Sequence, residues 1–99
     1  MTDEPLRVVI AEDSALIREG TARLIEESGG SVVAKVGDGE AFVRAVEKHR
    51  PDVSVVDVRM PPTQRDEGLR AAIEARRRVQ GTPIVVLSQY VERQALETE

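Results

Sequence analysis

The 99-residue chain contains no cysteine, is 32 % charged and carries a formal net charge of −4 at pH 7. The lack of cysteine excludes disulfides, iron–sulfur clusters and thiolate zinc sites from this sequence. The negative charge disfavours non-specific binding to nucleic acid or to an anionic membrane surface. Phe42 and Tyr90 are the only aromatic residues, and no apolar run approaches the length of a membrane span. We therefore expect a cytoplasmic protein with no membrane contact and no direct nucleic-acid contact.

Short apolar runs rich in β-branched residues alternate with segments whose apolar residues recur at helical spacing. The expected strands are residues 6–11, 31–36, 53–56 and 84–88. The expected helices are residues 15–28, 40–49 and 66–80, with a fourth that begins at residue 91. Strands alternating with helices in this way predict βαβ units, a parallel sheet and right-handed crossovers.

Local signals agree with these boundaries. Ser14 or Asp13 can cap the first helix, and Gly29-Gly30 suits its end. In the first helix, the residues at helical spacing are Ile17, Thr21, Leu24 and Ile25. In the second helix, we expect Phe42, Ala45 and Val46 to face inward. In the third helix, the residues at helical spacing are Leu69, Ala72, Ile73 and Val79.

Acidic residues follow two of the expected strands. Glu12-Asp13 ends the first strand, Asp57 ends the third, and Ser88 ends the fourth. Ligands of open parallel sheets bind outside the carboxyl ends of the strands. If the first and third strands are neighbours, three carboxylates converge there and raise one another's pKa. A hard cation such as Mg²⁺ relieves that repulsion, and a carboxylate beside it can attack phosphorus.

Each of these residues also has a plainer interpretation. An acidic pair after a strand is usually a helix cap, a strand-end aspartate is usually a turn residue, and a serine there is usually a turn or cap residue. Only the joint arrangement of Glu12, Asp13, Asp57 and Ser88 favours chemistry.

Three motifs resemble the receiver domain of two-component response regulators, most closely the group with a LuxR/NarL-type output domain. They are Val9-Ile10-Ala11-Glu12-Asp13, Val55-Val56-Asp57-Val58-Arg59-Met60-Pro61 and Pro83-Ile84-Val85-Val86-Leu87-Ser88, and Gly68 fits the glycine that opens the third helix of such domains. The resemblance implies a doubly wound, flavodoxin/CheY-like α/β fold with strand order 2-1-3-4. It also implies a Mg²⁺-dependent signalling switch phosphorylated by a sensor histidine kinase.

The family pattern transfers residue by residue. Asp57 resembles the phosphoacceptor, and Asp13 a direct Mg²⁺ ligand, with Glu12 acting through water. The backbone carbonyl of Arg59 resembles a further metal ligand, and Ser88 the switch hydroxyl that turns toward the phosphoryl group. Arg59 and Gln89 fall where receivers vary and where the lifetime of the phosphate is tuned.

One departure is that the family's fifth strand, its lysine and the fifth helix have no counterpart in the sequence. Lys35 and Lys48 are the only lysines and fall elsewhere. We therefore expect residues 1–99 to be an incomplete receiver domain of a longer transcription regulator, without the DNA-binding output domain. Phosphotransfer should be weak. The uncovered fourth strand and the start of the fourth helix should self-associate, unless residues 89–99 fold back over that edge.

Two other functions remain open. A phosphohydrolase of the haloacid-dehalogenase type also uses an aspartate nucleophile and Mg²⁺, but it requires Asp-x-Asp after the first strand, where this chain has Glu12-Asp13-Ser14. An interaction module that never takes phosphate would predict loss of the acidic residues, which are all present. We expect no enzymatic activity beyond self-catalysed phosphotransfer and dephosphorylation.

Overall fold

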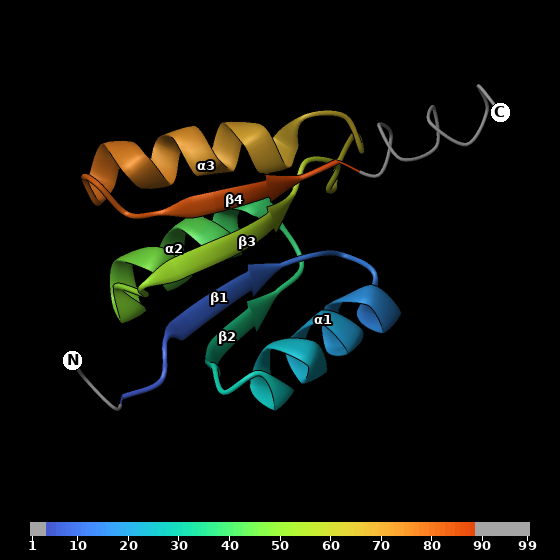
Figure 1. Cartoon of the computed structure of the whole chain (residues 1–99). Coiled ribbons are helices and arrows are strands. Elements are labelled where there is room, and N and C mark those ends of the chain that lie inside the picture. Colours follow the sequence, from blue (N-terminus) through green and yellow to red (C-terminus); the bar gives the residue numbers. More distant parts are fainter. Residues whose placement is uncertain (1–3, 89–99) are drawn as a thin grey trace, which may run out of the picture.

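The computed structural model describes residues 4–88, which form a parallel sheet with helices on both faces (Figure 1). Strands and helices alternate along the chain as the sequence predicts. Their order is β1 (Arg7–Ala11), α1 (Ala15–Glu27), β2 (Ser31–Val36), α2 (Gly39–His49), β3 (Val53–Asp57), α3 (Glu67–Arg78) and β4 (Ile84–Leu87). The helix expected from residue 91 lies outside the described residues, and no helix within residues 4–88 is long and apolar enough to cross a membrane.

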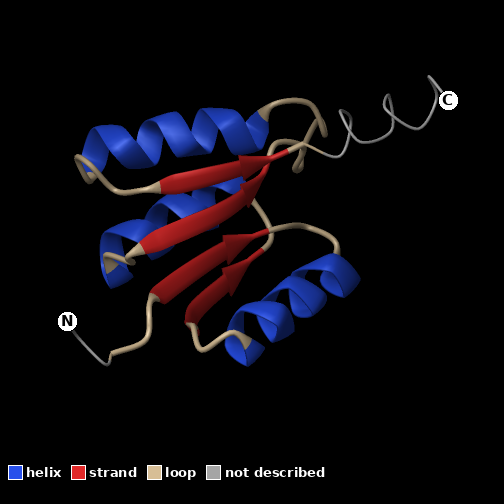
Figure 2. Ribbon diagram, in the orientation of Figure 1, coloured by secondary structure: helices blue, strands red, loops and turns tan. Residues whose placement is uncertain are grey.

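The four described strands run parallel in the order β2-β1-β3-β4, as the resemblance implied (Figure 2). The chain adds β2 on one side of β1 and then crosses to add β3 on the other side. The register pairs Ala11 of β1 with Val56 of β3. Because the next residues are Glu12 and Asp57, the two acidic strand ends lie at the same edge of the sheet, at its switch point.

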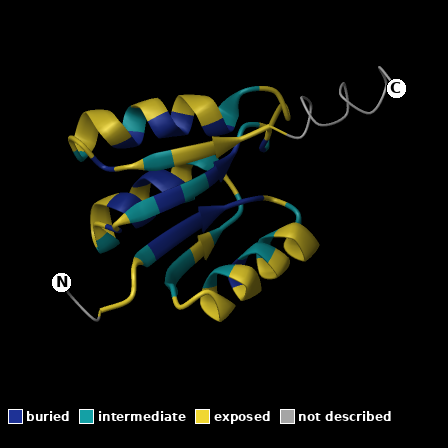
Figure 3. Ribbon diagram, in the orientation of Figure 1, coloured by how far each residue is buried: buried dark blue, intermediate teal, exposed yellow. Residues whose placement is uncertain are grey.

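Each face of the sheet has its own apolar layer, because successive side chains of a strand point to opposite faces. The helices α2 and α3 cover one face, and α1 covers the β1–β2 half of the other (Figures 1 and 3). The layer under α2 and α3 contains Val9, Ala11, Phe42, Val43, Ala45, Val46, Val56, Met60, Ala71 and Ala75. The smaller layer under α1 is built on Val8, Ile10 and Ala22. The inward positions expected for α2 are confirmed, since Phe42 and Val46 are fully buried.

The α3 helix buries a different stripe from the one that the larger apolar residues suggested. Leu69 and Ile73 are 44 % and 57 % exposed, whereas Ala71, Ala72 and Ala75 are buried. Val79 follows the last helical residue. The reason is a close approach between helices: a Cβ on Gly39 of α2 would lie 3.2 Å from the Ala71 Cβ. Only small side chains fit such an interface. Of the four residues noted at helical spacing in this helix, Ala72 alone is buried.

The face under α1 is only partly covered in the described region. Ile17 and Leu24 of α1 are 42 % and 66 % exposed, although they fall at the helical spacing noted in the sequence. On the same face, Val85 and Leu87 of β4 are each 48 % exposed. The α1 helix spans only the β1–β2 half of this face. Within residues 4–88, no helix covers the β3–β4 half.

Gly68 sets the distance between α3 and the end of β3. Its N–H donates to the Val58 carbonyl over 2.8 Å, and a Cβ there would overlap the carbonyl oxygen of Asp57. We expect Gly68→Ala to lower the free energy of unfolding by about 3 kcal/mol, because the helix must move away from the strand end. Urea unfolding measures the loss.

Gly20→Ala is the matched control. Gly20 lies within α1 and no atom would lie within 4 Å of an added Cβ. The same change there should stabilise the chain by about 0.5–1 kcal/mol through helix propensity. Equal effects at both positions would contradict the tight packing of Gly68.

Candidate functional site

Asp57 is held at the carboxyl end of β3 by the sheet on one side and by α3 on the other. It pairs with Leu87 of β4, and its carbonyl lies against Gly68. Its side chain is only 9 % exposed, and the Arg59 N–H lies 3.5 Å from its Oδ1 atom. The backbone around this carboxylate therefore has little freedom to move.

The β1–α1 loop brings two more carboxylates to the same edge. The Glu12 N–H donates to the Val36 carbonyl over 3.0 Å, and Arg18 Nη1 donates to the Glu12 carbonyl over 2.7 Å. Ser14, not Asp13, is the N-cap of α1, since its hydroxyl accepts from the Ile17 N–H. Asp13 is exposed and its carboxylate is free of any capping role, whereas Glu12 is buried at 4 % exposure.

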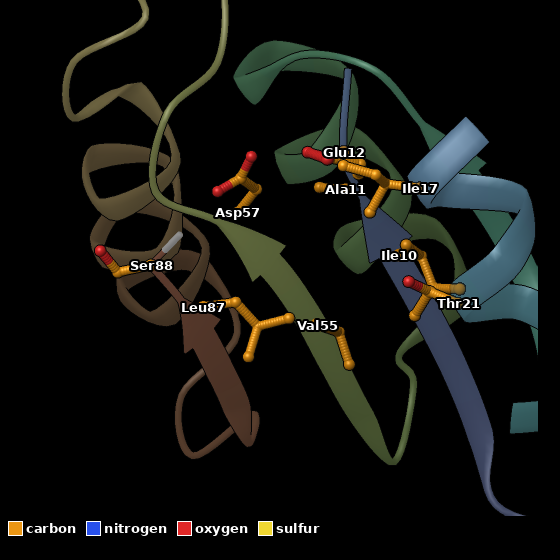
Figure 4. A pocket seen from close by; sticks show the side chains of 9 residues that line it. All are labelled: Ile10, Ala11, Glu12, Ile17, Thr21, Val55, Asp57, Leu87 and Ser88. Carbon is orange, nitrogen blue, oxygen red and sulfur yellow. The ribbon is translucent and has the colours of Figure 1, made fainter. Parts of the chain in front are cut away.

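The three carboxylates converge. Glu12, Asp13 and Asp57 each offer one oxygen, and these oxygens all lie within 4.8 Å of one another. Glu12 points across the end of β1 toward Asp57 (Figure 4). Burial, and then the neighbouring Asp57 carboxylate, raise the pKa of Glu12 to about 8. Its Oε2 atom is buried and accepts no hydrogen bond from any described residue.

These features fit a hard divalent cation. Mg²⁺ binds one or two carboxylates and keeps several waters, and the cluster has an exposed member at Asp13 and buried ones behind it. A buried carboxylate oxygen without a donor is costly unless a cation or proton compensates it. Glu12, Asp13 and Asp57 are thus the residues that would hold the metal.

Ser88 lies farther from the carboxylates, at the end of β4. Together with Glu12, Asp57 and Leu87 it lines a cavity of about 280 Å³, and its hydroxyl is directed away from Asp57 in Figure 4. The Arg59 side chain is exposed. Gln89, the other position expected to tune phosphate lifetime, lies outside the described residues.

Gln64 belongs to this site, although the sequence did not single it out. Its side-chain amide Nε2 donates to Asp13 Oδ2 over 2.9 Å. The contact joins two loops 51 residues apart in sequence, so no local pattern could reveal it. The available signal was only the long turn-forming segment between Met60 and Gly68.

Comparison with known proteins identifies the family. Residues 8–98 match the model of the response regulator receiver domain. The chain belongs to this family. It is 44 % identical over 94 residues to the transcriptional regulatory protein PdtaR of Mycobacterium tuberculosis, covering 94 % of this chain and 43 % of that protein. The probable transcriptional regulatory protein NarL of the same organism is 34 % identical over 90 residues, covering 90 % of this chain and 40 % of NarL.

Solved structures agree. The signal receiver domain of the putative response regulator NarL from Mycobacterium tuberculosis superposes with a TM-score of 0.74 at 34 % identity, over 86 % of this chain and 67 % of that one. A LuxR-family response regulator from Aurantimonas gives a TM-score of 0.78 at 28 % identity, over 85 % of this chain and 59 % of that one. This receiver domain spans less than half the length of the PdtaR and NarL proteins it matches.

The raised pKa of Glu12 predicts how stability changes with pH. The folded chain holds the Glu12 proton more tightly than the unfolded chain does, in which the pKa of this group is 4.5. Its contribution to stability is therefore full below pH 4.5 and is lost as pH rises through about 8. We expect the metal-free receiver to lose about 1–2 kcal/mol across this window, below the full linkage value because Asp13 opens the site to solvent.

Glu12→Gln is the informative variant, since an amide stays neutral at every pH. Urea unfolding of both proteins without metal at pH 5, 6.5 and 8 should show a decline in the wild type that the variant lacks. Parallel pH profiles would mean that Glu12 ionises normally.

Proposed function

We propose that the chain is a phosphoacceptor switch in which Asp57 receives a phosphoryl group from a sensor histidine kinase. The observation that carries this proposal is the convergence of Glu12, Asp13 and Asp57 at the carboxyl edge of a receiver-family sheet. The low exposure of Asp57 and its position at the sheet's switch point support it as the acceptor.

In the proposed step, a carboxylate oxygen of Asp57 attacks the phosphorus of a phosphohistidine. A P–O bond forms as the P–N bond breaks, and the released imidazole takes up a proton. The product is an acyl phosphate, whose hydrolysis returns the Asp57 carboxylate and free phosphate. Positioning and charge compensation dominate such transfers, which fits a site whose backbone is fixed on both sides of the acceptor.

The remaining residues take supporting roles in the proposal. Asp13 and Asp57 would hold Mg²⁺ directly, Glu12 through water, and the Arg59 backbone carbonyl would be a further ligand. When bound, the metal would neutralise charge that develops on the phosphoryl oxygens. Ser88 would turn toward the phosphoryl group as a hydrogen-bond donor, a movement its exposed position permits. Arg59 and Gln89 would set the lifetime of the phosphate.

Receiver domains are in general signalling modules without an enzymatic activity of their own. Some relatives are enzymes: a protein-glutamate methylesterase/protein-glutamine glutaminase of Haloarcula marismortui is 37 % identical over 91 % of this chain, which covers 23 % of that protein. We propose no esterase activity for this chain, because it matches only 23 % of the methylesterase. Phosphohydrolase activity is disfavoured because Asp57 ends β3 and no Asp-x-Asp follows β1.

We further propose that residues 1–99 act as the incomplete receiver part of a longer transcription regulator. PdtaR and NarL, named as transcriptional regulatory proteins, are more than twice as long as the matched region. In the longer regulator that contains this chain, phosphorylation of Asp57 would control the output domain.

Asp57→Asn tests the central assignment. Incubation with phosphoramidate and Mg²⁺, followed by intact mass measurement, should show one added phosphoryl group on the wild type and none above background on the variant, because the nucleophilic oxygen is gone. Asp52→Asn is the control. Asp52 is exposed before β3, and an asparagine there keeps an oxygen that can accept from the Arg7 N–H.

The Asp52→Asn protein should be modified at the wild-type rate. Phosphorylation of Asp57→Asn at that rate would refute Asp57 as the acceptor. If the wild type is not modified in Mg²⁺, the interaction-module function gains support instead.

A second part of the proposal is that the isolated chain self-associates through β4 and the start of the helix that the sequence predicts from residue 91. Within residues 4–88, β4 pairs only with β3, and Val85, Val86 and Leu87 are 48 %, 37 % and 48 % exposed. Exposed apolar residues on an edge strand favour pairing with another chain.

Sedimentation velocity at micromolar concentration should therefore detect a dimer. Val85→Lys should shift the equilibrium at least tenfold toward monomer, because a charge would be buried in the contact. Ile73→Lys, at an exposed apolar position on α3, should leave it unchanged. A monomer with slow amide exchange at residues 84–88 would contradict self-association and favour a fold-back of residues 89–99.

A further inference from the structure

The loop between β3 and α3 reaches over to the acidic site through one side chain. Gln64 is exposed, yet its amide donates to Asp13 Oδ2 over 2.9 Å. Asp13 is the exposed member of the carboxylate cluster. The amide is therefore positioned to fix the direction in which this carboxylate faces.

The loop backbone on both sides of Gln64 is held by one carboxylate. Glu67, the first residue of α3, accepts from the Thr63 N–H over 2.8 Å, from the Thr63 hydroxyl, and from the Arg65 N–H over 3.1 Å. The Thr63 hydroxyl lowers the pKa of Glu67, to about 2, so this acceptor is charged at neutral pH. Thr63 and Arg65 flank Gln64, which places the amide at the tip of a braced turn.

Gln64 itself has a backbone conformation that side chains rarely adopt. Its φ is +59°, in the left-handed region, which costs a non-glycine residue roughly 1–2 kcal/mol. Its N–H donates to the Met60 carbonyl over 2.9 Å, and Met60 is fully buried. The backbone of Gln64 is thus bound to a core residue, and its side chain is bound to the Asp13 carboxylate.

We propose that Gln64 is a positioning residue for the metal: its amide holds the Asp13 carboxylate toward Glu12 and Asp57, and so couples the β3–α3 loop to metal occupancy. The inference rests on the proposed role of Asp13 as a Mg²⁺ ligand and names a residue that acts on it. A carboxylate has about four acceptor positions, so a hydrogen bond to Oδ2 leaves others for a cation. Partners of this kind orient ligands, and their removal typically lowers metal affinity 10–100-fold.

The coupling works in both directions. If the Gln64 amide favours the metal-binding direction of Asp13, then bound metal favours the loop conformation that makes this hydrogen bond. Mg²⁺ should therefore slow amide exchange within residues 63–66. This readout does not depend on phosphorylation.

The test is a calorimetric titration of the 99-residue chain with MgCl₂. We expect Gln64→Ala to weaken Mg²⁺ binding about tenfold and to abolish the Mg²⁺-dependent slowing of amide exchange in residues 63–66. Gln80→Ala removes an exposed amide just after α3, at the opposite end of that helix from the site, and should change neither measurement.

A double-mutant cycle separates positioning from general loosening of the loop. In an Asp13→Ala background, Gln64→Ala should have less than a twofold further effect on Mg²⁺ affinity, since the acceptor of its hydrogen bond is gone. A full tenfold effect in that background would mean that Gln64 acts elsewhere. Unchanged or tighter Mg²⁺ binding by Gln64→Ala alone would overturn the proposal and make the amide a competitor of the metal.

The outcomes also distinguish this inference from the proposed function. If the wild-type chain binds no Mg²⁺, the metal site fails and the role of Gln64 fails with it. If Mg²⁺ binds and Gln64→Ala weakens it while Asp57 takes no phosphoryl group, the positioning role stands and the phosphoacceptor assignment fails.

Discussion

Repulsion among three carboxylates at one edge of the sheet is the constraint on which the rest of this structure depends. Parallel pairing of β1 with β3 forces Glu12 and Asp57 to the same end, and Asp13 follows in the same loop. Glu12 is buried enough for its pKa to rise to about 8. Stability alone would favour an apolar residue at this position, because burying a carboxyl oxygen without a hydrogen-bond partner is unfavourable. The cluster therefore fits the site proposed above for a cation and a phosphoryl group.

The surrounding structure keeps these carboxylates from moving apart. Gly68 lets the start of α3 lie against the Asp57 carbonyl. Arg18 holds the Glu12 carbonyl from α1, and Gln64 reaches Asp13 from the β3–α3 loop. The first two contacts fix the backbone beside Asp57 and Glu12, and the third is made to the Asp13 carboxylate itself. Such preorganisation is what the proposed phosphoryl transfer would require.

Much of the fold and the centre of the site could be predicted from the sequence. Short β-branched runs and helical spacing placed the seven described elements to within a few residues. The strand ends identified Glu12, Asp13 and Asp57, which the structure brings together. The apolar spacing of α3 located the helix but not its buried face, since Leu69 and Ile73 are exposed. Hydrophobic spacing measures side-chain size and polarity along one helix, whereas the buried face of α3 is set by how closely α2 approaches.

The sequence by itself determined the periodicities, the strand ends and the residue types at them, since these depend on neighbours in the chain. Only the tertiary structure decided which of Asp13 and Ser14 caps α1, how deeply Glu12 is buried, and that Gln64 contacts Asp13. These depend on distances between segments that the chain brings together from far apart. A hydrogen bond between residues 51 positions apart leaves no trace in local spacing, and the pKa of a carboxyl follows from the solvent and charge that the folded neighbours leave around it.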